Sequence, residues 1–324
     1  MNDRREFVRA AGCGVLMIPL AAFAQPSAPR IARIAILSPG ANEARSVFTA
    51  FRTQLRKLGH EEGRDVALEF FFGKGNEQLA SLAQVIVRRG FDIVLADGRL
   101  AAQAMQAASR TMPIVAVAGE PVSNGLAASL VRPGGNVTGV ATMAVELGAK
   151  QLELLCEILP SARRIGMVDA SQRPGAAFRS FEDRAAELRV ALRRIVIQTQ
   201  ADAERELAPA ALRDIDGLVL PANALIGGLI APLVRLIEAA GKPAIYGEKE
   251  FVPLGGLVFY GFDIDDSFRR CAGIVDRVLK GADPATTPFE QPTRIGLVVN
   301  VKAARAIGLK FPYAVIARAD EVIQ

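Results

Sequence analysis

From residue 31 onward, short apolar runs rich in Val and Ile alternate with segments whose apolar residues recur every three or four positions. The segment 43–58 shows the second pattern, since Val47, Phe51 and Leu55 would share one face of a helix. Together the two patterns predict strands at 31–37, 66–71, 92–96 and 114–118 and helices at 43–58, 78–88 and 100–108. Such alternation predicts a parallel sheet covered by helices on both faces.

After the glycine-rich stretch 132–139 the same alternation begins again. It predicts strands at 164–168, 194–199, 217–220 and 243–246 and helices at 146–158, 175–192, 201–212 and 226–240. The later segments at 257–260, 265–280, 295–300 and 302–307 would complete either series. Two strand–helix series of similar length predict an α/β protein with two lobes.

Ligand groups in such sheets are expected directly after each strand, because parallel strands deliver their loops at the carboxyl edge. The first series supplies Ser38, Pro39, Gly40, Asp97, Gly98, Arg99, Gly119 and Glu120 at these positions. The second series supplies Asp169, Ser171, Asn223 and Tyr246. If the two lobes face each other, these residues surround one cleft, which is the candidate ligand site.

The first 24 residues differ from the rest of the chain. A charged segment at 2–9 precedes an uncharged apolar run at 10–23, and the run closes in Ala22-Phe23-Ala24. This order is typical of a secretory signal peptide cleaved after Ala24, and the run is shorter than the roughly 20 residues of a membrane-spanning helix. Because Arg4 and Arg5 also fit a twin-arginine signal, two export routes stay open.

Composition and charge exclude several classes of function. The 324-residue chain has 39 Lys and Arg against 34 Asp and Glu, a net charge of +5. The basic residues form no block along the sequence, and 6% of the residues are aromatic. We therefore expect no nucleic-acid partner. Three Cys and the single His60 form no metal or redox spacing, and there is no phosphate loop or nucleophile–base pair. We therefore expect no metal, no cofactor and no enzymatic activity, with His60 a solvated turn residue.

Several segments match one known family in the same order along the mature chain. They are 50–59, 62–66, 121–126, 132–139, 243–246, 255–261, 290–293, Asn300, 306–309 and 317–323. Through them the chain resembles the extracytoplasmic substrate-binding proteins of ABC importers, in the subgroup with the type I periplasmic-binding fold. The resemblance implies two three-layer αβα Rossmann-like lobes with parallel sheets and a hinge with three crossovers.

The resemblance also implies boundaries for the lobes. The N-terminal lobe would comprise 30–139 plus 263–284 and the C-terminal lobe 140–262 plus 285–324, with crossovers near 139–143, 260–263 and 290–293. The sequence departs from the family pattern at His60, at 97–99 and at Glu120. The last two departures lie at the predicted cleft, so they affect the identity of the solute rather than the fold.

For function, the resemblance implies a periplasmic monomer that captures a small solute and delivers it to separately encoded ABC permease and ATPase subunits. Known ligands of such proteins suggest an amino acid, aromatic ones included. Its carboxylate would pair with Arg99 or backbone N–H groups and its ammonium with Asp97 or Glu120, while Tyr246 or Tyr260 would contact an apolar side chain. A second function stays open, in which the same two-lobed receiver signals to a membrane receptor without transport.

Overall fold

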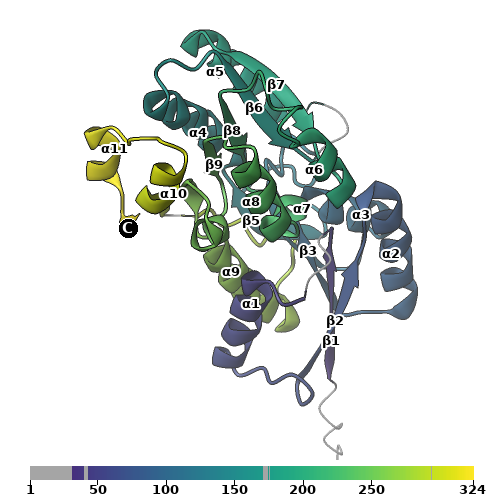
Figure 1. The fold of residues 1–324 in the computed structure, drawn as a ribbon. Helices are drawn as coiled ribbons and strands as arrows, with labels where there is room; N and C mark the ends of the chain where they lie inside the picture. The colour runs from purple at the N-terminus through teal and green to yellow at the C-terminus, as the bar shows by residue number, and fades with distance from the viewer. Residues whose placement is uncertain (1–30, 40–42, 171–173, 175, 293) are drawn as a thin grey trace, which may run out of the picture. The chain divides into compact units, whose positions relative to one another are not determined.

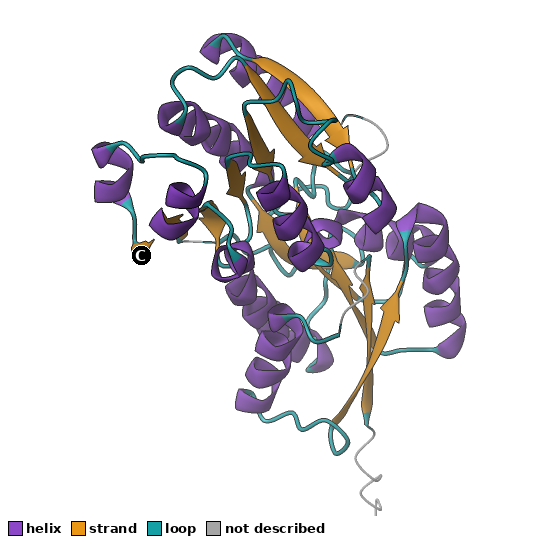
Figure 2. Ribbon diagram, viewed as in Figure 1, coloured by secondary structure: helices purple, strands orange, loops and turns teal. Residues whose placement is uncertain are grey.

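The computed structural model describes residues 31–39, 43–170, 174, 176–292 and 294–324. Within them the chain forms two lobes, each built on one β-sheet with helices on both faces (Figures 1 and 2). The predicted signal peptide, Gly40 and Ser171 lie outside the described residues. In the described part of the chain, no helix combines the length and the apolar character needed to cross a membrane.

The first lobe contains a five-stranded parallel sheet in the order β2-β1-β3-β4-β5. Its strands are β1 (Ala32–Ser38), β2 (Val66–Phe72), β3 (Ile93–Asp97), β4 (Ile114–Gly119) and β5 (Val137–Thr142). One face is covered by α1 (Ser46–Lys57) and α9 (Ile264–Leu279), and the other by α2 (Gly75–Arg89) and α3 (Arg99–Ala108). Every residue of β3 is buried, because apolar side chains leave both faces of this central strand and enter two separate cores.

The second lobe contains a seven-stranded sheet in the order β12-β11-β10-β9-β8-β6-β7. Its strands are β6 (Arg164–Asp169), β7 (Ala191–Val196), β8 (Gly217–Leu220), β9 (Ala244–Tyr246), β10 (Val258–Phe262), β11 (Ile295–Asn300) and β12 (Glu321–Ile323). One face is covered by α4 (Ala144–Ile158), α5 (Ala176–Leu188), α10 (Val301–Ala306) and α11 (Tyr313–Arg318). The other is covered by α6 (Gln200–Glu206), α7 (Ala224–Gly227), α8 (Ile230–Ala239) and the 3-10 helix η1 (Lys249–Leu254).

One strand pair in the second sheet runs antiparallel, with Val258 of β10 opposite Val299 of β11. The chain leaves β10 to form α9 in the first lobe and returns through Glu290, which pairs with Val140 of β5. Because the chain re-enters the second sheet near the end of β10, β11 runs back along that strand. The chain passes between the lobes after β5, after β10 and before β11, which confirms the predicted fold with three crossovers. The residue boundaries of the lobes stay a prediction.

Most predicted elements are present, and the differences have local causes. The helix predicted over 175–192 ends at Leu188, because the next residue, Arg189, has a left-handed φ of 58° that a helix cannot continue through. The helix predicted over 226–240 is divided into α7 and α8 at Gly228. The strand β5 was not predicted, since Thr138 and Gly139 weaken its apolar run.

The prediction that His60 is a solvated turn residue is wrong. Its Nε2 atom lies 2.7 Å from Oδ1 of Asp276 in α9, and its side chain is 17% exposed. The two residues come together because α9 packs on α1, directly before His60. The interaction therefore links the loop after α1 to a helix that arrives late in the chain.

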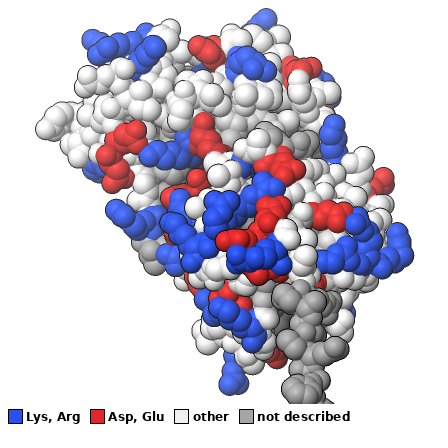
Figure 3. Space-filling view, turned by 90° about the horizontal axis from the view of Figure 1, so that it is seen from below, with Lys and Arg blue, Asp and Glu red and all other residues white. Residues whose placement is uncertain are grey.

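Charged side chains of both signs are intermixed on the face shown in Figure 3. This face lacks the continuous patch of positive charge with which proteins bind the phosphate backbone of a nucleic acid. This distribution agrees with the even spread of basic and acidic residues along the sequence.

Candidate ligand-binding site

The carboxyl ends of strands from both sheets surround one cavity of about 160 Å³. From the first lobe it is lined by Arg45, Asp97, Gly98, Arg99, Val117, Gly119, Glu120, Thr142 and Ile264. From the second lobe it is lined by Met167, Val168, Asp169, Ala170, Phe181, Pro221, Ala222, Asn223, Ala224, Glu248 and Phe262. Residues of both lobes thus face one shared cavity, as expected for a site that binds a small solute.

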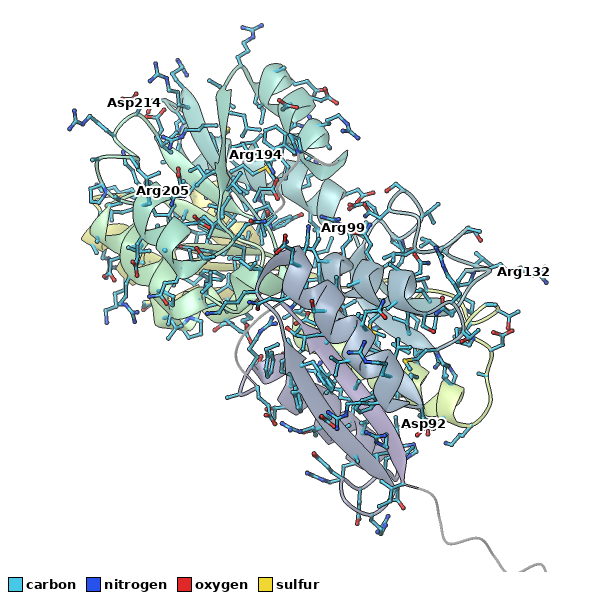
Figure 4. All side chains as sticks on the ribbon, turned by 90° about the vertical axis from the view of Figure 1, so that its right-hand side faces the viewer. Asp92, Arg99, Arg132, Arg194, Arg205 and Asp214 are labelled. Atoms are coloured by element: carbon cyan, nitrogen blue, oxygen red, sulfur yellow. The ribbon has the colours of Figure 1, made fainter. Side chains whose placement is uncertain are left out.

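The sequence predicts ligand groups directly after each strand, and this expectation is called the strand-end rule. The cavity brings together most of the described residues that this rule selects. They are Asp97, Gly98, Arg99, Gly119, Glu120, Asp169 and Asn223. Ser38 lies behind the wall, where its hydroxyl donates to Oδ2 of Asp97 at 2.7 Å. Pro39 is buried and is not part of the wall. Figure 4 shows Arg99 where the first lobe adjoins the second.

The two predicted tyrosine contacts lie elsewhere. Tyr246 is 2% exposed, and its ring stacks on that of Phe251 with 4.4 Å between the centroids. The side chain therefore faces the core beneath η1, and burial raises the pKa of its phenol. Tyr260 borders a separate hollow of about 440 Å³ on the second lobe. The aromatic rings on the described cavity wall are instead those of Phe181 and Phe262.

Arg45, which the sequence analysis missed, lies at the centre of a buried charge cluster. It precedes α1, and its Nη1 donates to Oδ2 of Asp97 at 2.8 Å, while its Nη2 lies 3.7 Å from Oε2 of Glu248. The side chains of Arg45, Asp97 and Glu248 are 5%, 4% and 2% exposed. Burial lowers the pKa of Arg45, but the charges of Asp97 and Glu248 outweigh it and raise the pKa above its ordinary value.

Glu248 carries the most perturbed carboxyl group of this cluster. Burial raises its pKa to about 7, against the opposing effect of Arg45 and with reinforcement from the negative charges of Glu250 and Asp97. The backbone N–H of Asn223 donates to Oε1 of Glu248 at 3.2 Å, while Oε2 has no hydrogen-bond partner among the described residues. The carboxyl group therefore has unused bonding capacity inside the cavity wall.

The remaining charged groups of the wall are held at the strand ends. Nε of Arg194 donates to Oδ2 of Asp169 at 2.7 Å, and Nη1 of Arg99 donates to Oε1 of Gln103 at 2.8 Å. Glu120 has a φ of 41°, a left-handed conformation that residues other than glycine rarely adopt and that is common at binding sites. The wall thus presents fixed charges of both signs next to apolar surface.

Several wall residues were missed for identifiable reasons. Thr142 and Phe262 stand at the ends of β5 and β10, so the strand-end rule finds both once those strands are given their full length. Arg45 precedes the helix that follows β1, a position that the rule did not cover. Phe181 lies within α5, where its apolar character alone gives no sign of a binding role.

Within the described residues, no group of three or more His, Cys, Asp and Glu side chains is placed to hold a metal ion. The cavity wall is instead a mixture of paired charges, backbone groups and apolar side chains. This is the composition of a site that binds an organic solute.

The fold and the cavity agree with a family comparison. The model of the ABC transporter substrate binding protein family matches residues 31–323. The chain belongs to this family. Members of this substrate-binding protein family are extracytoplasmic, bind small-molecule ligands and work with ABC permeases; they are not enzymes, which confirms the prediction of a non-enzymatic role.

Three known proteins are similar to this substrate-binding protein. A tyrosine-binding protein of Clostridioides difficile is 24% identical over 266 residues, which is 80% of this chain and 76% of the relative. A conserved domain protein from Vibrio cholerae has a TM-score of 0.80 at 24% identity, covering 90% of this chain and 100% of that chain. An ABC domain from Streptococcus pneumoniae in complex with L-Trp has a TM-score of 0.79 at 22% identity, covering 91% and 100%. The two structures establish the shared two-lobed fold.

Proposed function

We propose that this protein is the exported binding component of an ABC importer, which captures an amino acid between its lobes and delivers it to a membrane permease with a separate ATPase. The observation that carries the proposal is the cavity wall, where the first lobe contributes charges of both signs and the second lobe contributes two carboxylates beside apolar side chains. A zwitterion needs a cation and an anion within reach at the same time. Capture and release require no bond to be made or broken.

The first lobe supplies the charged groups for the predicted roles. We assign the carboxylate of the solute to Arg99, which follows the end of β3. We assign its ammonium to Glu120, which follows β4, or to Asp97, which also accepts from Arg45 and Ser38 at 2.8 and 2.7 Å.

The apolar part of the wall supports an amino acid with an aromatic or large apolar side chain. Phe181 and Phe262 contribute two rings, and Met167 adds a polarizable thioether to the same surface. Two of the similar proteins are described as binding tyrosine and L-Trp. Aromatic amino acids are therefore the first solutes to test.

Export is part of the same proposal. Residues 1–24 serve as a signal peptide, so the mature periplasmic protein begins at Gln25 and acts as a monomer. N-terminal sequencing of the exported form is expected to start at Gln25. An intact Met1 on the exported protein would contradict this part of the proposal.

A thermal-shift screen of the mature protein tests the assignment of solute class. A solute at 100 times its dissociation constant adds about 2.7 kcal/mol to the free energy of unfolding, so a true ligand is expected to raise the melting temperature clearly. The screen includes all amino acids and small carboxylates. No shift with any amino acid at millimolar concentration would overturn the proposal. Uptake of the identified solute by cells with and without the gene distinguishes import from sensing.

A further inference from the structure

Two charged contacts cross the cleft at the start of α1. Arg45 approaches Glu248 of the second lobe at 3.7 Å, and the neighbouring Ser46 hydroxyl donates to Oε1 of Glu250 in η1. Ser46 Oγ also lies 2.7 Å from Oδ1 of Asp265 in α9. The start of α1 in the first lobe thus contacts two carboxylates of the second lobe, Glu248 and Glu250.

The first-lobe side of this contact is fixed before the lobes meet. Arg45 is held by Asp97 at 2.8 Å, and Asp97 in turn accepts from Ser38 at 2.7 Å. All three residues belong to the first lobe, at β1, β3 and the start of α1. The guanidinium is therefore oriented toward the cleft whether or not Glu248 is present.

The contact between the lobes is only partly satisfied. The 3.7 Å separation of Arg45 and Glu248 is that of an ion pair and is too long for a hydrogen bond. Among the described residues, Nε of Arg45 and Oε2 of Glu248 have no hydrogen-bond partner although both atoms are buried. Desolvation outweighs the attraction of Arg45 while Glu248 is ionised, so this contact favours closure when the carboxyl group is protonated and does not make closure irreversible.

The packing around the pair depends on a glycine at position 227. A Cβ atom there would lie 2.5 Å from Nη2 of Arg45 and 2.6 Å from Oε2 of Glu248. Gly227 ends α7 and has no left-handed φ, so an alanine would fit the helix but not the ion pair. Nearby, a Cβ at Gly98 would lie 3.0 Å from Cβ of Ala224 on the opposite lobe, which shows how closely the two walls approach.

We propose that Arg45, Ser46, Glu248 and Glu250 form an interlobe latch, which contributes part of the free energy of closing before any solute binds. The latch rests on the proposed function, in which the cleft closes on a solute. It sets apparent solute affinity through the closed fraction, because affinity falls in proportion to the population of the binding-competent state. Glu250 is outside the cavity wall, so it acts on affinity through closure alone.

The distance between the lobes in solute-free protein tests the latch. Labels are attached at Arg132→Cys in the first lobe and Asp214→Cys in the second, which lie on opposite sides of the view in Figure 4. The background carries Cys156→Ser, while Cys271 is buried and stays unlabelled. Mature protein is freed of bound solute by unfolding, dialysis and refolding, and pulsed electron spin resonance then gives the distance distribution.

Wild-type protein without solute is expected to show a substantial closed population. Gly227→Ala should lower the closed-to-open ratio about tenfold, and Glu250→Gln should lower it in the same direction. Gly273→Ala is the matched control, since a Cβ there meets only the end of the Arg277 side chain at 3.9 Å, in the middle of α9. Circular dichroism verifies that each variant is folded, and Glu250→Gln decides the question if Gly227→Ala does not fold.

Two results would overturn the latch. One is a wild-type protein that is open throughout without solute. The other is a distribution that neither Gly227→Ala nor Glu250→Gln changes relative to Gly273→Ala. Because this measurement contains no solute, its failure is distinct from a failure of the proposed function, which would appear in the solute screen.

Discussion

Arg45 and Glu248 meet across the cleft, with Nη2 of the arginine 3.7 Å from Oε2 of the glutamate. Arg45 is held in the first lobe by its hydrogen bond to Asp97, and Glu248 is held in the second lobe by the backbone N–H of Asn223. One buried cation therefore lies between carboxylates of two different lobes. Loss of Arg45 leaves two buried carboxylates without their cation, and loss of Asp97 removes the closer partner of Arg45, so either change affects stability and closure together.

Asp97→Ala is expected to lower the free energy of unfolding by about 3 to 5 kcal/mol, because it removes the hydrogen-bonded partner of the buried Arg45 guanidinium and leaves only the longer contact with Glu248. Urea denaturation at pH 7 measures the loss. Asp214→Ala is the control, since Asp214 forms a solvent-exposed pair with Arg164 at 3.3 Å and should change stability by less than about 1 kcal/mol. Similar losses in the two variants would contradict the structural role of the buried pair.

Solute binding is expected to weaken as the pH rises from the ordinary titration range of a glutamate to about 7, and to level off above it. Burial raises the pKa of Glu248 to about 7 in the closed cleft, whereas the same carboxyl exposed in an open cleft titrates near its ordinary value. The closed state therefore binds the proton more tightly, so its advantage is fully present below the ordinary pKa of the carboxyl group and is lost progressively until the pH reaches about 7. Arg45, Asp97 and Glu250 all affect the pKa of this carboxyl group. Because closure takes up at most one proton, the solute affinity changes by at most about tenfold per pH unit.

Glu248→Gln is the control for this pH dependence, because an amide keeps the shape of the side chain and does not titrate. Calorimetric titrations at about pH 5, 6, 7 and 8 are expected to give a wild-type affinity that falls up to about pH 7 and then levels off, and a flat profile for the variant. A flat wild-type profile, or an equal slope in both proteins, would assign the proton to another group.

The order of the elements was predictable from the sequence because strands covered on both faces are short, continuous apolar runs. The strand predicted at 217–220 is β8, and its four residues are all buried between two helical layers. Even so, β7 begins at Ala191 rather than at 194, since Arg189 ends α5 early. Boundaries set by a single backbone conformation leave no trace in the apolar pattern.

The candidate site was only partly predictable. Asp97, Asp169 and Asn223 reach the cavity because strand ends of parallel sheets gather at one edge. Tyr246 does not, because β9 is buried on both faces and its apolar run does not indicate which face each side chain takes. The pairing of Arg45 with Glu248 depends on how the lobes close, and neither helix periodicity nor strand alternation contains that information.

Asp276→Asn is expected to destabilise the protein by roughly 1 to 3 kcal/mol at pH 7 and by little in strong acid. Burial alone would raise the pKa of Asp276, but hydrogen bonds from Lys280 and His60 lower it below its ordinary value. Its ionised form therefore stabilises the fold above the usual titration range of aspartate, and this contribution is lost as the pH falls through the lowered pKa. Urea denaturation of both proteins across the acid range should give curves that converge; curves that stay parallel would contradict the assignment.

Arg99→Ala is expected to weaken amino-acid binding by roughly 10- to 150-fold, because a charge-assisted contact with the solute carboxylate contributes about 1.5 to 3 kcal/mol. Arg99 begins α3 on the cavity wall, where it also donates a hydrogen bond to Gln103 of the same helix. Arg205→Ala is the matched control, since that side chain is 63% exposed on α6 of the second lobe and is absent from the cavity wall. Calorimetric titration with the amino acid found in the screen compares the three proteins. If Arg99→Ala and Arg205→Ala both bind within about twofold of the wild type, Arg99 does not contact the carboxylate, and backbone N–H groups at the strand ends take that role.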